Sequence, residues 1–122
     1  MRRSQFDALV EKALARIPKR FRDAMENVQI IVEDWPDPEL MEEVTGDPDG
    51  IVYGLFTGTP ITERRFDDWG DLPAMIQLYR GPLIEDFPDH EELVREIEMT
   101  LAHEIAHYMG FDEGILAEYG YD

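Results

Sequence analysis

An apolar stripe runs through the C-terminal third of the chain. Four large aliphatic residues recur there every four positions: Leu93, Ile97, Leu101 and Ile105. This spacing is typical of one face of an α-helix. We therefore predict a helix that is capped by Asp89 and Glu92 and runs to Met109, a length of about 30 Å. Such a stripe must be covered, so a sheet should pack along this side of the helix.

The opposite side of the same predicted helix carries two histidines, His103 and His107. Residues four apart lie on one helix face, so both imidazoles can reach one ion. His103 is about 200° around the helix from Leu101, which places it nearly opposite the apolar stripe. Glu104 completes a His-Glu-x-x-His pattern. In this pattern the glutamate is the general base for a metal-bound water and is not a ligand.

Gly110 is predicted to end the helix, because glycine readily adopts the left-handed conformation found after a helix C-terminus. The chain can then turn back and carry Glu113 to the metal as the third protein ligand. Two histidines and one carboxylate would leave a fourth position for water, as in catalytic zinc sites. Asp112 and Glu118 are the alternatives to Glu113. Imidazole and carboxylate ligands favour zinc, although iron, cobalt or nickel would accept similar ligands.

The eleven residues from His103 to Glu113 resemble the extended metzincin motif His-Glu-x-x-His-x-x-Gly-x-x-His, with Glu113 in place of the third histidine. They resemble more closely the small bacterial zincin-like proteins, a minimal metallopeptidase-like family whose third ligand position is acidic. Residues 76–83, with the sequence IQLYRGPL, are similar to the strand before the active-site helices of that family.

This resemblance implies a zincin fold with zinc on His103, His107 and Glu113, and with Glu104 as the base. It also suggests that the strand at residues 75–80 is an edge strand that pairs with an extended substrate. A plain strand with both neighbours filled is the alternative. The residues after Glu113 are too few for a metzincin Met-turn or lower subdomain, so half of the usual substrate cleft is expected to be absent.

The remaining periodicities predict an α+β, zincin-like domain over residues 1–122. Its small three-stranded mixed sheet packs on the long metal-binding helix, with further helices at the N-terminus. The other predicted helices cover residues 4–17, 19–26, 38–44 and 82–87, and the predicted strands cover residues 28–34, 51–57 and 75–80.

The sequence identifies side chains that could bind a substrate less clearly than it identifies the metal ligands. Gln77 and Tyr79 lie on the strand that the resemblance assigns to substrate binding. Tyr119 or Tyr121 could stabilise an oxyanion through its phenol, but packing is the favoured use for these side chains. A polar loop at residues 61–73 contains Trp69, which could line a substrate groove or fix the loop to the body of the protein.

Composition narrows the possible partners. The 122 residues include 28 acidic and 11 basic side chains, and the formal net charge of −17 argues against nucleic-acid phosphate as a partner. No apolar run approaches the roughly 20 residues of a membrane span, so no membrane partner is expected. There are no cysteines, so a metal must use nitrogen and oxygen ligands. We expect a cytoplasmic protein that acts on a peptide or protein substrate.

These observations favour a zinc-dependent hydrolase of peptide bonds, in which Glu104 activates the metal-bound water. The alternative is a catalytically weak or inactive module that binds peptides and is stabilised by the metal. A third hypothesis is a structural protein without a metal.

Overall fold

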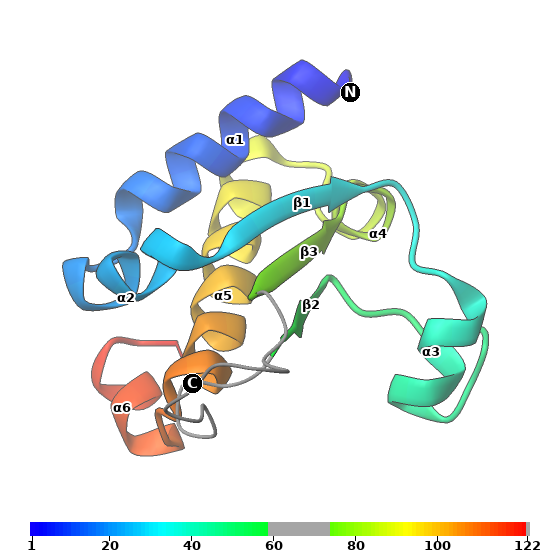
Figure 1. Cartoon of the computed structure of the whole chain (residues 1–122). Coiled ribbons are helices and arrows are strands. Elements are labelled where there is room, and N and C mark those ends of the chain that lie inside the picture. Colours follow the sequence, from blue (N-terminus) through cyan, green and yellow to red (C-terminus); the bar gives the residue numbers. More distant parts are fainter. Residues whose placement is uncertain (59–73, 122) are drawn as a thin grey trace.

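β3 (Met75–Tyr79) is the central strand of a three-stranded mixed sheet (Figure 1). β1 (Gln29–Glu33) pairs with it in parallel, with Ile30 opposite Ile76. β2 (Gly54–Thr57) pairs with its other side antiparallel, with Phe56 opposite Ile76. The computed structural model describes residues 1–58 and 74–121. The α+β class and the small mixed sheet predicted from the sequence are confirmed.

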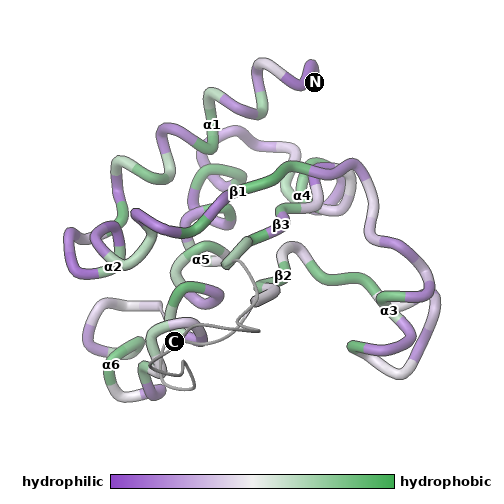
Figure 2. The backbone as a smooth tube through the Cα atoms, viewed as in Figure 1, coloured by the Kyte–Doolittle hydropathy of each residue, from purple (hydrophilic) through white to green (hydrophobic). Residues whose placement is uncertain are grey.

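α5 (His90–Met109) is the long helix on which the sheet packs. All four residues of the predicted apolar stripe are fully buried in the hydrophobic core. The helix contacts β2 and β3 on one side, and also contacts α1 (Arg3–Arg16) and α2 (Lys19–Ala24). Figure 2 shows hydrophobic residues along β1 and at intervals along α1 and α5. The core therefore lies between the sheet and these helices.

Three short helices complete the described part of the chain, together with a 3₁₀ turn at Met25–Asn27. α3 (Pro38–Thr45) begins at an Asp37 cap, whose side chain accepts a hydrogen bond from the Glu39 N–H at 2.9 Å. α4 (Arg80–Asp86) follows β3 directly, and α6 (Glu113–Glu118) is near the C-terminus. No helix within residues 1–58 and 74–121 has the length and apolarity that crossing a membrane requires.

The predicted role of residues 75–80 as an edge strand is wrong. β3 is hydrogen-bonded on both sides, so neither of its edges is open to a substrate backbone. Several boundaries also differ from the prediction, by one to three residues. β2 spans only residues 54–57 of the expected 51–57, and α1 begins before Ser4, at Arg3.

Removing the Asp89 cap is expected to destabilise the fold. The Asp89 side chain accepts a hydrogen bond from the Glu92 N–H at 3.1 Å and so satisfies a donor at the start of α5. Asp89→Ala should lower the free energy of unfolding by about 1 kcal/mol, measured by urea denaturation. The matched control is Asp7→Ala, because Asp7 is an exposed carboxylate in α1. Equal midpoints for the two variants would contradict the capping role.

Candidate metal centre

The end of α5 has the reversal that the sequence predicts. Gly110 is in the left-handed conformation with a φ of 72°, and the Phe111 N–H donates to the Ala106 carbonyl at 2.9 Å. The chain then enters α6, whose first residue is Glu113. Asp112 caps α6, because its Oδ1 accepts a hydrogen bond from the Ile115 N–H at 3.0 Å. This carboxylate is therefore already engaged in a structural role.

Glu104 is fixed to the sheet by a hydrogen bond. Its Oε2 accepts a hydrogen bond from the backbone N–H of Phe56 in β2 at 3.1 Å, and only 17% of its side chain is exposed. Burial raises the pKa of Glu104 above its usual value, while the Phe56 N–H and the two motif histidines act in the opposite direction. A carboxylate with a raised pKa is a better proton acceptor, which suits a general base.

The two histidines of the motif have different surroundings. The His103 ring is partly buried, and its Nε2 contacts the backbone carbonyl oxygen of Tyr121. The His107 side chain is 71% exposed, and its Nδ1 lies 3.7 Å from Glu104 Oε2. His103 and Glu104 line one cavity of about 280 Å³ next to β2, with Val52, Tyr53, Gly54 and Thr100. The base and one predicted ligand thus face a common space.

The predicted third ligand is not gathered with the two histidines. Within residues 1–58 and 74–121, no three His, Cys, Asp or Glu side chains form a group that could hold a metal ion. Glu113 is exposed on the first turn of α6, and Glu118 is exposed at its other end. Two imidazoles with a nearby acid are nevertheless a donor set that suits zinc. His103, His107 and Glu113 as ligands therefore stay a prediction.

The three predicted substrate-binding residues lie elsewhere. The Tyr79 hydroxyl donates to Gln77 Oε1 at 3.3 Å, and both residues line a separate cavity of about 440 Å³. They alternate along β3 with Ile76 and Leu78, which are buried in the main core, so they lie on the other face of the sheet. Tyr119 packs edge-on against the Phe21 ring at a centroid distance of 5.0 Å. Residues 61–73 of the predicted loop lie outside the described part.

The contact between β2 and Glu104 was not foreseen from the sequence. A backbone N–H has no residue-type signal, so Phe56 could not be identified in that way. The sequence did contain one sign that another element approaches this strand closely: Gly54 is an isolated glycine in a predicted strand. A Cβ at Gly54 would lie 2.6 Å from Cγ2 of Thr100 in α5. The glycine therefore allows β2 to approach the helix that carries the motif.

Comparison with known proteins supports a family and a fold. The family described as Zincin-like metallopeptidase matches residues 25–121. A solved structure of a conserved hypothetical protein from the bacterium T. thermophilus is similar, with a TM-score of 0.53 and 23% sequence identity over 98% of each chain. At this identity the structural match supports the fold alone. No curated protein matches the sequence.

Proposed function

The chain belongs to the zincin-like metallopeptidase family, and from this premise we propose that it is a zinc-dependent hydrolase that cleaves peptide bonds. The observation that carries the proposal is the partly buried Glu104 carboxylate, which lines a cavity with His103 and has His107 close by. His103, His107 and Glu113 are the residues that would hold the zinc ion. The proposal requires that these three side chains come together when zinc binds.

Glu104 performs the proton transfers in this proposal. Zinc, when bound, would supply a Lewis acid and lower the pKa of a water molecule. Glu104 would accept a proton from the water that attacks the substrate carbonyl, and would then deliver it to the leaving amine. The hydrogen bond from the Phe56 N–H keeps the Glu104 carboxylate beside the cavity during both transfers. Burial favours the protonated form that the second transfer needs.

β2 replaces β3 as the strand that would bind an extended peptide. It is an outer strand of the described sheet, and its Phe56 N–H already points to Glu104 instead of to β3. Main-chain hydrogen bonds to such an edge hold a peptide with little dependence on its sequence. This placement would put a scissile bond near Glu104 and supports a peptide as the substrate.

A peptide-library cleavage assay tests the proposal. The full chain is incubated with the library in the presence of zinc and, separately, in the presence of a chelator. Cleavage that requires zinc is the expected result. If zinc binds but no peptide is cleaved, the alternative of a metal-stabilised binding module is favoured. The dispersed ligand set within the described residues bears on the third hypothesis, a structural protein without a metal, which failure to bind zinc would favour.

A further inference from the structure

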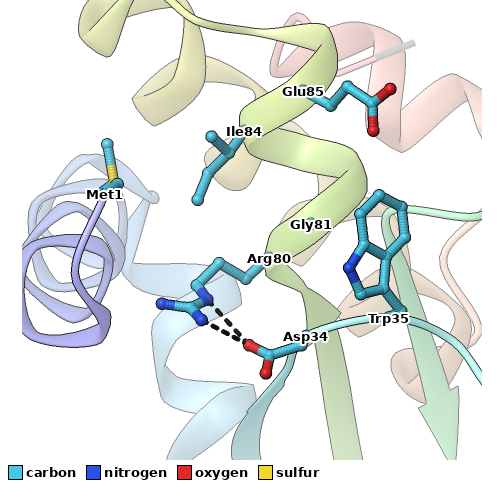
Figure 3. A pocket seen from close by; sticks show the side chains of 7 residues that line it. All are labelled: Met1, Asp34, Trp35, Arg80, Gly81, Ile84 and Glu85. Carbon is cyan, nitrogen blue, oxygen red and sulfur yellow. Dashed lines mark hydrogen bonds and ion pairs between the residues drawn. The ribbon is translucent and has the colours of Figure 1, made fainter.

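Trp35 is a large aromatic residue that the fold holds at the surface. It follows the end of β1 and is 55% exposed. One part of its indole lies against the backbone of Gly81 in α4, where an added Cβ would come within 2.4 Å of Trp35 Cε2 (Figure 3). The Gly81 N–H also donates to the Asp34 carbonyl at 2.7 Å. The glycine thus allows α4 to hold the indole in place while more than half of the side chain stays accessible.

Trp35 forms a wall of two separate cavities. The first is about 410 Å³ in volume and is lined by Trp35 with residues from the chain start, the end of β1 and α4: Met1, Asp34, Arg80, Gly81, Ile84 and Glu85 (Figure 3). The second is about 440 Å³ in volume and is lined by Trp35 with Glu33, Asp37, Leu40, Gln77 and Tyr79. β1 and β3 are parallel, so both cavities lie where the carboxyl ends of two parallel strands meet, a common place for ligands.

The side chains around Trp35 carry a net negative charge: the second cavity has two carboxylates and no basic side chain, and the first has two carboxylates and Arg80. Four carboxylates line the two cavities: Glu33, Asp34, Asp37 and Glu85. The one guanidinium, that of Arg80, is bound to Asp34 Oδ1 through Nε at 3.0 Å and Nη2 at 2.7 Å. Within the part of the chain that the structure describes, no basic side chain pairs with the other three carboxylates. Burial, and then the charges of Glu33 and Asp37, raise the pKa of the Tyr79 phenol in the second cavity.

These features together select one kind of ligand. An anion would be repelled by these exposed carboxylates, and a neutral group would gain no ionic attraction from them. A cation can lie against the indole face and pair with a carboxylate at the same time. The formal net charge of −17 would also steer a cation toward the protein.

We propose that the surface around Trp35 binds a peptide segment that carries two neighbouring basic side chains, one in each cavity. Arginine is the best fit, because its flat guanidinium stacks on an aromatic ring and forms forked hydrogen bonds to a carboxylate. The two cavities at Trp35 share no lining residue with the cavity that His103 and Glu104 line. This binding does not depend on zinc or on hydrolysis.

The test is calorimetric titration of the full chain with the acetylated and amidated peptide Gly-Arg-Arg-Gly at about 0.15 M salt. The comparison peptide has the uncharged isostere citrulline at both arginine positions. We expect saturable binding of the arginine peptide, at least about tenfold weaker binding of the citrulline peptide, and a shift of the Trp35 indole N–H signal in NMR spectra.

Substitutions at the Trp35 surface test whether the arginine peptide binds there. Trp35→Ala should weaken binding of the arginine peptide about tenfold, and Trp35→Phe should weaken it less because it keeps an aromatic face. Glu33→Gln and Asp37→Asn should each weaken binding about threefold. The controls are Ile51→Ala, an apolar truncation at 56% exposure, and Glu11→Gln, an equal loss of charge in α1.

Three results would overturn the proposal. One is equal binding of the citrulline peptide, which would mean that charge is not recognised. Another is unchanged binding by Trp35→Ala when its circular dichroism spectrum shows it to be folded. The last is an equal effect of Glu11→Gln and the two cavity variants Glu33→Gln and Asp37→Asn, because attraction would then come from the overall charge and not from this surface.

Discussion

Replacing Glu104 by glutamine is expected to abolish hydrolysis while zinc stays bound. Glutamine has nearly the same shape, and its amide oxygen can still accept the hydrogen bond from the Phe56 N–H. It cannot accept the proton of the attacking water or pass it to the leaving amine. Loss of general acid–base catalysis should lower kcat by about 10³-fold. The measurements are the cleavage rate of a library-selected peptide and the zinc content of the purified variant.

The control for this prediction is Glu96→Gln. Glu96 is on the same helix about two turns before Glu104, so it tests loss of a carboxylate from α5 without touching the motif. Its cleavage rate should match that of the unaltered protein. Activity that survives in Glu104→Gln would show that another group is the base. Loss of zinc together with activity would show that Glu104 is a ligand.

Truncating Phe21 is expected to cause the largest loss of stability. Phe21 is fully buried in α2 and contacts three aromatic rings edge-on, those of Phe111, Tyr119 and Tyr121, at centroid distances of 5.5, 5.0 and 5.6 Å. Phe21→Ala should lower the free energy of unfolding by about 4 kcal/mol, because it leaves a cavity and removes these ring contacts. Urea denaturation of the metal-free protein measures this change.

The aromatic cluster around Phe21 also joins α2 to the segment that contains Glu113. Phe111 lies just before α6, and Tyr119 caps its end. If Glu113 is a ligand, Phe21→Ala should therefore also weaken zinc binding. Ile51→Ala is the control, because Ile51 is exposed and its truncation should cost less than about 0.5 kcal/mol. A loss below about 1 kcal/mol in Phe21→Ala would contradict the structural role given to the cluster.

Much of the fold could be predicted because it follows from local patterns. The stripe from Leu93 to Ile105 identified α5, and its residues are buried as expected. The cap at Asp89 is confirmed, since its side chain accepts a hydrogen bond from the Glu92 N–H of the helix that follows. Gly110 has the positive φ that its position required. Each of these signals acts within a few residues of the chain.

The order of the strands could not be predicted in this way. β3 lies between β1 and β2, and nothing in the sequence of β3 distinguishes a central strand from an edge strand. Its alternation fits both, because Ile76 and Leu78 face the core while Gln77 and Tyr79 face the other side. The prediction that β3 is an edge strand is therefore wrong, because it has a neighbour on each side.

Only the local part of the candidate site could be predicted from the sequence. The one-turn spacing of His103 and His107 is a property of a single helix, and both residues are in α5 as expected. The place of Glu113 depends on how α6 packs after the Gly110 turn, which involves distant residues such as Phe21. The hydrogen bond from Phe56 to Glu104 joins residues that are 48 positions apart, so only the folded structure could reveal it.

Elemental analysis of bound zinc is the most direct measurement of the site. The unaltered chain, after dialysis against a buffer with limiting zinc, should retain about one zinc ion per chain. His103→Ala, His107→Ala and Glu113→Gln should each lose it, whereas Asp112→Asn and Glu118→Gln should retain it. An unaltered chain without stoichiometric zinc, or a Glu113→Gln variant that binds zinc as tightly as the unaltered chain, would contradict the predicted ligand set.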